Sequence, residues 1–317
     1  MLNKVLENAK TIAIGGHVRP DGDCVGSCMG MYLYIQKYFP EKTVDVYLRD
    51  IPESLKIIDG MENIRTEINE EDVYDLFICQ DCGDKGRLDF SAPLYDNAKH
   101  TFCIDHHISN QEFAEVNYII PEASSTSELV YNLFDKAKIT KEIAEALYLG
   151  IVHDTGVFQY SCATPSTFRA AADLLEKGID APKMIRETYY EKTFAQNQIL
   201  AYALLKAFLL LEGKCIASYL TKEELDKYHV TKKDMDGIVA QLRNTTGIEA
   251  AIFLYQLDES EFKISLRSND LVDVSVIAQK FGGGGHRRAA GFGMKQGPEE
   301  SIRLIAEQIE LQLGCES

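Results

Sequence analysis

Aspartate and histidine residues gather directly after several short apolar segments in the first half of the sequence. His17-Val-Arg-Pro-Asp21-Gly-Asp23 follows one segment, Asp81 ends a second, and Asp105-His106-His107 ends a third. A fourth pair, His153-Asp154, stands at the end of a helical pattern. Taken singly, an aspartate at such a position most often caps the next helix, and His153 is more often packed in a core than bound to a ligand. The four clusters together predict a shared site.

The segments that carry these clusters alternate between two kinds of pattern. Largely apolar runs, which predict strands buried on both faces, stand at Thr11–Gly16, Val44–Arg49, Leu76–Asp81 and Thr101–Asp105. Amphipathic runs, which predict helices, stand at Asp23–Tyr38, Ser124–Ala137, Lys141–Val152 and Pro165–Lys177. This alternation is typical of a doubly wound α/β domain with a parallel sheet, in which ligands bind where the carboxyl ends of the strands meet.

Carboxylates that crowd at one edge of a sheet raise one another's pKa unless a cation neutralises them. Mixed imidazole and carboxylate ligands suit divalent ions such as Mn²⁺. Two ions roughly 3.5–4 Å apart need a bridging carboxylate, and Asp81 suits that role because it ends a central strand. The predicted metal ligands are His17, Asp21, Asp23, Asp81, His106 and Asp154.

The second half combines predicted strands and helices with a run of four glycines at 282–285, which is followed by His286-Arg287-Arg288. Adjacent glycines let the backbone turn its N–H groups toward an anion, and an arginine fork such as that of Arg267 fits phosphate oxygens. The alternatives are a flexible surface loop for the glycine run and a surface strand position for Arg267. Residues 186–211 look helical and are predicted to connect the two halves.

The order and spacing of the four acidic and histidine motifs resemble those of the DHH phosphoesterase superfamily. In the second half, Gly282–Gly291 resembles the glycine-rich signature of the DHH-associated substrate-binding domain, and Ser265–Ser268 resembles the arginine segment that precedes it. The resemblance spans nearly the whole chain. Within the superfamily, the sequence resembles the branch that contains nano-RNases and pAp phosphatases, which are also called bifunctional oligoribonucleases.

This resemblance implies a role for each matching residue. One metal would be held by His17, Asp21 and Asp81, and the other by Asp23, Asp81, His106 and Asp154. His107 would be catalytic or contact phosphate, and Asp105 would orient His106 or His107. The substrate would be bound by Arg267, Gly284, Gly285, His286 and Arg287.

The distribution of charge and of predicted elements indicates a division of the chain, and the resemblance implies a role for each part. Residues 1–185 would form the catalytic metal-binding domain, and residues 212–317 a smaller mixed α/β substrate-binding domain. Residues 186–211 would be a helical linker, and the active site would lie in the cleft between the domains. Most of the excess negative charge falls in residues 1–185, which supports a boundary near residue 185.

The composition excludes several other classes of protein. The chain has 317 residues, of which 45% are hydrophobic, and a formal net charge of −16. This suits two domains with real cores and argues against a protein that coats long DNA or RNA. The most apolar stretch, residues 207–211, is flanked by Lys206 and Glu212, so no membrane span is expected. The first residues lack an apolar signal core, which favours a cytoplasmic location.

Eight cysteines are scattered along the chain, at positions 24, 28, 79, 82, 103, 162, 215 and 315. This distribution predicts reduced thiols rather than a disulfide framework. Cys79 and Cys82 form a Cys-x-x-Cys pair, for which a zinc or redox site is the alternative to ordinary buried thiols.

The sequence therefore predicts an enzyme, a Mn²⁺-dependent phosphoesterase that activates water with two metal ions. Mg²⁺ or Co²⁺ are the alternative ions. The substrates that the resemblance implies are short oligoribonucleotides (nano-RNA and linear dinucleotides such as pApA or pGpG) or pAp, with no long duplex nucleic acid and no membrane as partner. Cyclic-di-AMP hydrolysis and a non-catalytic nucleotide-binding module remain alternatives, and a homodimer is left open.

Overall fold

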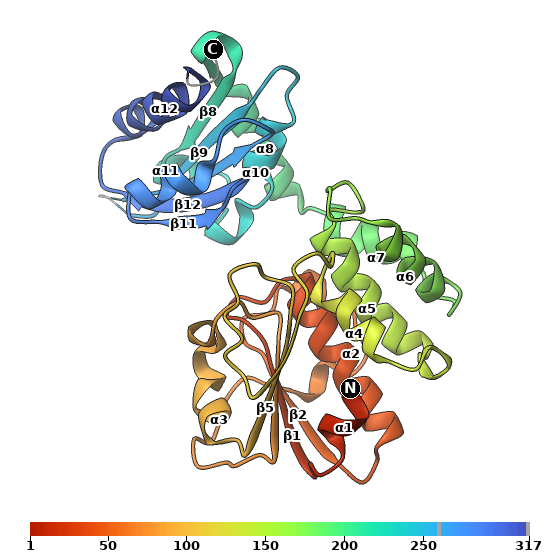
Figure 1. Ribbon diagram of the computed structural model, residues 1–317. Coiled ribbons are helices and arrows are strands. Elements are labelled where there is room, and N and C mark those ends of the chain that lie inside the picture. Colours follow the sequence, from red (N-terminus) through yellow and green to blue (C-terminus); the bar gives the residue numbers. More distant parts are fainter. Residues whose placement is uncertain (259–260, 315–317) are drawn as a thin grey trace. The chain divides into compact units, whose positions relative to one another are not determined.

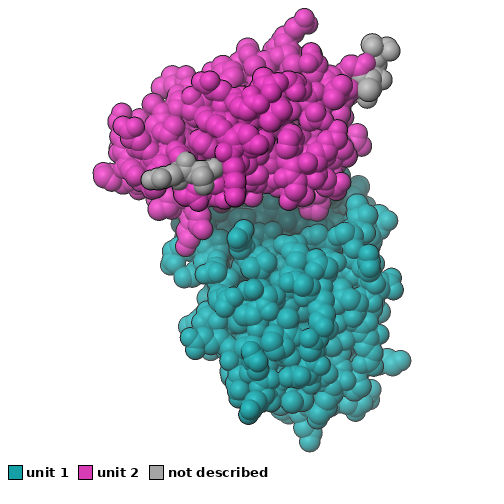
Figure 2. Space-filling model, turned by 90° about the vertical axis from the view of Figure 1, so that its left-hand side faces the viewer, with its two compact units in different colours: residues 1–191 teal, residues 192–317 magenta. Residues whose placement is uncertain are grey.

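A computed structural model describes residues 1–258 and 261–314 of the chain (Figure 1). The contacts divide the chain into two compact units, Met1–Glu191 and Lys192–Ser317 (Figure 2). Each unit is built around a six-stranded sheet of its own. Cys315, one of the eight predicted thiols, lies outside the described residues.

The sheet of the first unit is parallel throughout, with the strand order β3-β2-β1-β4-β5-β6. Its strands are β1 (Thr11–Gly15), β2 (Thr43–Tyr47), β3 (Ile64–Arg65), β4 (Leu76–Gln80), β5 (His100–Asp105) and β6 (Val116–Ile119). The predicted doubly wound α/β fold is confirmed. The short edge strands β3 and β6 were not predicted, because neither is a fully buried apolar run.

The helices of this unit are α1 (Leu2–Leu6), α2 (Gly22–Tyr38), α3 (Ala92–Asn97), α4 (Thr126–Leu133), α5 (Lys141–Asp154), α6 (Pro165–Leu175) and α7 (Ala181–Ile185). Figure 1 shows α2, α4 and α5 on one face of the sheet and α3 on the other. Short turns complete the unit: η1 (Glu53–Leu55), η2 (Met61–Asn63), η3 (Lys85–Ser91), η4 (Lys136–Lys138) and the π-helical turn η5 (Arg186–Tyr190).

Helices α2 and α5 approach each other closely, because glycines line their contact. A Cβ atom on Gly26 of α2 would lie 2.4 Å from the backbone oxygen of Ala146 on α5. A Cβ atom on Gly150 of α5 would lie 2.6 Å from a carboxylate oxygen of Asp23 on α2. This close packing brings the end of α5 beside the start of α2, where two of the predicted clusters stand.

Apolar residues fill both faces of the first sheet. Ile12, Ile14 and Ile78 point into the core under α2 and α5. The alternate residues Phe77 and Cys79 point into the smaller core under α3. Cys82 and Cys103 share that smaller core, and all seven described cysteines are free thiols, as predicted.

The sheet of the second unit is mixed, with the order β11-β12-β10-β9-β8-β7, and only β8 and β9 are parallel neighbours. Its strands are β7 (Phe208–Leu210), β8 (Cys215–Leu220), β9 (Ala250–Gln256), β10 (Phe262–Ser268), β11 (Gly284–His286) and β12 (Ala289–Met294). Its helices are α8 (Phe194–Leu205), α9 (Lys222–Lys227), α10 (Ile238–Arg243), α11 (Val274–Lys280) and α12 (Pro298–Gly314), with the turns η6 (Leu211–Gly213) and η7 (Lys232–Asp234).

Helices cover both faces of this second sheet. Ile264 and Ile305 belong to the core under α11 and α12. Ile199 and Ala203 of α8 pack against Leu242 of α10 on the opposite face. Part of the segment predicted to be a linker is therefore a core element of the second unit, and the unit boundary follows Glu191 rather than residue 185. Among the described residues, no helix combines the length and the apolar character needed to cross a membrane.

Candidate active site

The predicted clusters of the first unit meet at the carboxyl edge of its sheet. His17 follows β1, Asp81 follows β4, and Asp105 ends β5. These three strands are parallel neighbours in the order β1-β4-β5, so their carboxyl ends lie side by side. Asp154 reaches the same edge from the last residue of α5.

Asp81 occupies the centre of this group. One of its carboxylate oxygens lies 3.4 Å from Nε2 of His17. The other lies 3.8 Å from Nε2 of His106 and 3.7 Å from Nδ1 of His107, and it accepts a 3.3 Å hydrogen bond from the hydroxyl of Thr126. Asp81 is only 2% exposed. The position predicted for a bridging carboxylate therefore lies between histidines that follow β1 and β5, the two strands that flank β4.

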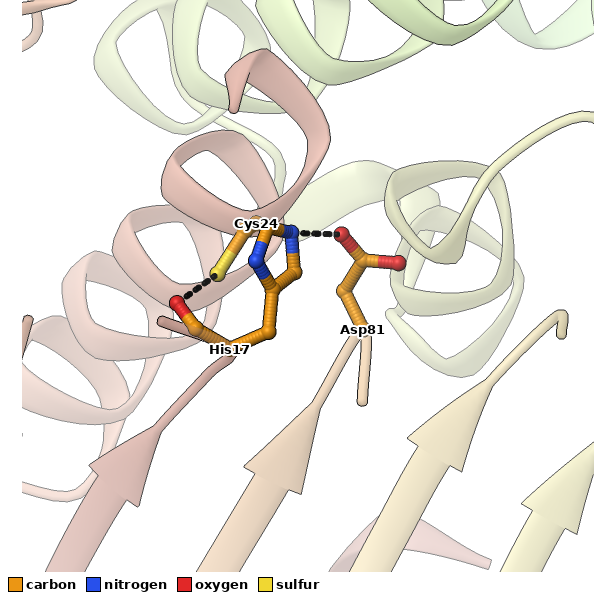
Figure 3. A group of neighbouring side chains, drawn as sticks. All are labelled: His17, Cys24 and Asp81. Carbon is orange, nitrogen blue, oxygen red and sulfur yellow. Dashed lines mark hydrogen bonds and ion pairs between the residues drawn. The ribbon is translucent and has the colours of Figure 1, made fainter. Parts of the chain in front are cut away.

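His17 is oriented by its own backbone surroundings. Its Nδ1 donates to the carbonyl of Val18 at 2.9 Å, which directs Nε2 toward Asp81 (Figure 3). The same Nε2 lies 3.6 Å from a carboxylate oxygen of Asp21. Burial lowers the pKa of His17, but its contacts with Asp21 and Asp81 outweigh burial and raise the pKa to about 11. The thiol of Cys24 contacts the backbone oxygen of His17 at 4.0 Å.

Asp21 and Asp23 have different partners, although one glycine separates them. Asp21 caps α2, since its carboxylate accepts hydrogen bonds from the backbone N–H groups of Asp23 and Cys24 at 3.1 Å each. The carboxylate of Asp23 is fully buried and accepts from the backbone N–H groups of Thr126 at 2.6 Å and Ser127 at 2.8 Å. Those groups belong to the positive end of α4, which suits a carboxylate.

Asp23 still carries an electrostatic penalty at this position. Burial raises its pKa well above the ordinary value, and the nearby carboxylates of Asp81 and Asp154 raise it further. Burial likewise raises the pKa of Asp154 to about 6. A cation between these carboxylates would favour their charged forms, so the electrostatics fit a metal centre.

His106 is held in the orientation of a ligand. Its Nδ1 donates to the carbonyl of Ala123 at 3.3 Å, and its Nε2 lies 3.0 Å from a carboxylate oxygen of Asp154. A histidine that ligates a metal commonly donates its other ring N–H to a backbone carbonyl in this way. Burial lowers the pKa of His106, but its contact with Asp154 and the nearby charges of Asp23 and Asp81 together outweigh burial and raise the pKa to about 11.

His107 belongs to a second chain of hydrogen bonds. Its Nδ1 lies 2.7 Å from a carboxylate oxygen of Asp105, which raises the pKa of His107. The other oxygen of Asp105 accepts from the side-chain amide of Asn110 at 2.7 Å. Asp105 therefore contacts His107 rather than His106.

Donor atoms of the first unit form three groups that could each hold a metal ion, with all ligand atoms of a group within 4.8 Å of one another. The groups are His17, Cys24 and Asp81; Asp81, His106 and His107; and Asp23, His106 and Asp154. Imidazole nitrogens and carboxylate oxygens predominate, a ligand mixture that fits divalent ions such as Mn²⁺. The residues present therefore fit divalent metal ions; Asp81 and His106 each belong to two groups, whereas Asp21 belongs to none of the three.

The Cys-x-x-Cys pair takes no part in these groups. Burial raises the pKa of the Cys79 thiol, and the thiol of Cys82 donates to the carbonyl of Asp84 at 3.1 Å. Among residues 1–258 and 261–314, no group able to hold a metal contains Cys79 or Cys82. The two thiols serve as packing groups of the core under α3.

Four residues at this edge were not predicted from the sequence: Cys24, Asn110, Thr126 and Ser127. The run Ser124-Ser-Thr-Ser127 offered a signal for two of them, because small hydroxyl residues before a helix mark an N-terminus that can bind an anion. No sequence pattern marked Asn110, because its hydrogen bond to Asp105 depends on how the loop after β5 folds.

The predicted phosphate-binding residues all lie in the second unit. Arg267 of β10 pairs with Ala289 of β12, which in turn pairs with His286 of β11. Directly paired positions share a face of a sheet, so Arg267 and His286 flank a small alanine on the same face. Gly284, Gly285, His286 and Arg287 are exposed. The glycine run is thus partly a strand, and Arg287 begins the tight turn between β11 and β12.

Gly285 has a conformational reason to be glycine. Its φ is +148°, and a Cβ atom there would lie 2.4 Å from the backbone oxygen of Ala289. Arg267 donates from its guanidinium to the carbonyl of Leu266 at 2.9 Å and lies on the half-exposed face of β10. The structure therefore brings Arg267 and the glycine segment to one edge of the second sheet.

Comparisons with known proteins agree with both units. The DHH family, N-terminal domain, matches residues 11–151, and the DHHA1 domain matches residues 212–314. The Bifunctional oligoribonuclease and PAP phosphatase NrnA of Bacillus subtilis is 27% identical over 94% of this chain and 93% of its own length. The Probable bifunctional oligoribonuclease and PAP phosphatase NrnA of Streptococcus mutans is 30% identical over 89% of this chain and 88% of its own length.

A solved structure is also similar over almost the whole length. The crystal structure of an exopolyphosphatase-related protein from Bacteroides fragilis matches with a TM-score of 0.91 and 30% sequence identity. The match covers 98% of this chain and 94% of that one.

Proposed function

This chain belongs to the DHH family, and on that premise we propose that it is a divalent-metal-dependent phosphoesterase that hydrolyses short oligoribonucleotides and pAp. One observation carries the proposal: buried and half-buried carboxylates and imidazoles that follow β1, β4 and β5 or end α5 converge around Asp81. The relatives that share both domains are named for oligoribonuclease and pAp phosphatase activity, which supports this choice of substrates.

We assign two ions, most simply Mn²⁺, to six residues of the first unit. One ion would be held by His17, Asp21 and Asp81, and the other by Asp23, Asp81, His106 and Asp154. When bound, such ions lower the pKa of water and offset negative charge on phosphate oxygens.

Side chains of the protein supply the proton for the leaving oxygen. The Asp105–His107 hydrogen bond fixes the orientation of the imidazole and leaves Nε2 as the ring nitrogen that can give a proton to the leaving oxygen. Asn110 holds Asp105 from the other side and keeps that orientation. His107 therefore acts as the general acid, and Asp105 and Asn110 are positioning residues.

The second unit supplies contacts to substrate phosphate in this proposal. Arg267 would bind phosphate oxygens through its guanidinium, and the backbone N–H groups of Gly284 and Gly285 would approach the same anion beside His286 and Arg287. This cationic segment is only a few residues long, in a chain whose net charge is −16. Such a segment fits a substrate with few phosphates better than a long polymer.

The direct test is a product assay with metal-depleted protein, to which Mn²⁺, Mg²⁺ or Co²⁺ is added back. The protein is offered pApA, pGpG, a 20-nucleotide RNA, pAp, cyclic-di-AMP and pyrophosphate at equal concentration. Fast hydrolysis of the dinucleotides and pAp with Mn²⁺ supports the proposal. Preferential hydrolysis of cyclic-di-AMP, or binding of nucleotides with no turnover under any metal, would overturn it in favour of the alternative functions.

A further inference from the structure

The end of the first unit carries a series of aromatic rings that starts beside the candidate metal centre. The π-helical turn η5 contains Thr188, Tyr189 and Tyr190, and it packs against η1, which follows β2. A π-helical turn is a rare feature that often marks a functional position. Glu191 closes this turn, since its N–H donates to the carbonyl of Arg186 at 2.7 Å, five residues earlier.

His153 connects this turn to the acidic cluster. The hydroxyl of Thr188 donates to the carbonyl of Met184 at 2.8 Å, so its oxygen accepts the 3.0 Å hydrogen bond from Nε2 of His153. The His153 ring also lies directly on Gly22, where an added Cβ atom would be 2.2 Å from Cγ of the imidazole. Gly22 separates Asp21 from Asp23, so the imidazole is in contact with the loop of the proposed ligands.

Two tyrosines extend outward from His153. The ring of Tyr189 meets that of His153 edge to face, with centroids 5.5 Å apart and planes at 76°. The ring of Tyr190 meets that of Tyr189 in the same manner, at 5.2 Å and 78°. Tyr190 is 54% exposed. An edge-to-face contact occupies at most one face of a ring, so part of the Tyr190 ring is available to a planar ligand.

We propose that Tyr190, supported by Tyr189 and His153, is a stacking subsite for a nucleobase of the substrate. The inference rests on the proposed function, because that function places a nucleotide phosphate at the neighbouring acidic cluster. The chain contains no tryptophan, so base stacking must use another aromatic or a planar cationic side chain. Stacking on one ring accepts any base, which suits an enzyme that degrades short RNA of any sequence.

The test compares substrates with and without bases. Hydrolysis of pApA and of the same sugar–phosphate backbone lacking both adenines is measured for the wild type, Tyr190→Ala and Tyr190→Phe. We expect Tyr190→Ala to raise KM for pApA about tenfold with kcat within twofold, and to leave KM for the base-free backbone unchanged. Tyr190→Phe should keep the wild-type KM, because it retains the ring.

Phe168→Ala is the matched control, because Phe168 of α6 is 52% exposed and stacks on Phe158. This control should change neither KM. If Tyr190→Ala leaves KM for pApA unchanged, or raises KM equally for both substrates, the stacking subsite is wrong while the proposed function stands.

If the wild type hydrolyses neither substrate, a binding measurement tests the stacking subsite independently of the proposed phosphoesterase function. Calorimetry then compares AMP with ribose 5-phosphate. Tighter binding of AMP by the wild type, with the difference lost in Tyr190→Ala, supports the subsite although the proposed function has failed. Equal affinities for the two ligands, or a difference that Tyr190→Ala retains, overturn the subsite.

Discussion

The carboxylate of Asp23 accepts a 2.6 Å hydrogen bond from the backbone N–H of Thr126, a residue 103 positions later in the sequence. The contact joins the start of α2 to the start of α4 beneath the edge of the sheet where the other acidic residues meet. The donor is a backbone N–H group, which a substitution of the Thr126 side chain does not remove. The stability of the acidic cluster therefore depends on how closely α2, α4 and α5 pack.

Replacing Asp81 should separate activity from folding. We expect Asp81→Ala to reduce Mn²⁺-dependent hydrolysis of pApA by roughly 10³-fold or more, because the proposed bridging ligand acts as a unit with both ions. The variant should fold, since removing one of several crowded carboxylates relieves repulsion. Mass spectrometry measures the manganese content of the variant, which tests the loss of the bridging ligand. Circular dichroism tests whether the variant folds. Asp84→Ala, at an exposed carboxylate three residues later, is the control, and full activity of Asp81→Ala would contradict the ligand assignment.

Gly150 should tolerate no side chain. Alanine usually stabilises a helix relative to glycine, by about 1 kcal/mol. Here the added Cβ would lie 1.9 Å from the hydroxyl of Ser127 and 2.6 Å from the carboxylate of Asp23. We expect Gly150→Ala to lower the free energy of unfolding by about 1–3 kcal/mol and to weaken Mn²⁺ binding. Urea unfolding and metal titration measure both effects. Gly297→Ala, where no atom lies within 4 Å of the added Cβ, should change neither.

Asn110 is predicted to act on catalysis only through Asp105. We expect Asn110→Ala to reduce kcat for pAp about tenfold with little change in KM, because the imidazole of His107 loses its fixed orientation. Steady-state kinetics separate the two constants. Asn63→Ala, at an exposed asparagine of η2, serves as the control. A rise in KM with unchanged kcat would indicate a binding role instead.

Arg267 is predicted to bind phosphate. We expect Arg267→Ala to raise KM for pApA at least about tenfold, the usual effect of losing a hydrogen bond to a charged group. Arg267→Lys should recover only part of the loss, since an ammonium lacks the guanidinium fork. Lys263→Ala removes a cation from the same face of β10 and should leave KM near the wild-type value. Equal effects of Arg267→Ala and Lys263→Ala would indicate a general charge effect.

Acid stability should depend on Asp75, at the opposite end of the first sheet. The Lys99 ammonium, 2.8 Å away, holds the pKa of the Asp75 carboxyl below its usual range, with help from the backbone N–H groups of Lys10 and Thr11. Because the folded-state pKa is the lower one, this stabilisation is present above about pH 4 and is lost as pH falls toward the folded-state pKa. Urea unfolding from pH 7 to pH 2 should show a shallower acid decline for Asp75→Asn. An unchanged slope would contradict this role.

Much of the site could be predicted from spacing alone. The parallel sheet follows from apolar runs that alternate with amphipathic ones, and the acidic clusters at strand ends follow from the same pattern. Since parallel strands place their carboxyl ends at one edge, His17, Asp81 and His106 were expected to meet, and they do. The glycine run and Arg267 were each predicted to bind phosphate, and the register of β10, β12 and β11 brings them to the same part of the second sheet.

Other relationships were decided only by the tertiary structure. The sequence placed Asp23 beside Asp21, but packing of α4 against α2 selected the N–H groups of Thr126 and Ser127 as its partners. From the sequence, Asp105 could orient either His106 or His107. The fold of the loop after β5 places Nδ1 of His107 beside its carboxylate. The π-helical turn that carries Tyr190 had no local signal at all. Local periodicity determines which segments become strands and helices, whereas the partner of a buried polar group depends on which distant segments the core brings into contact.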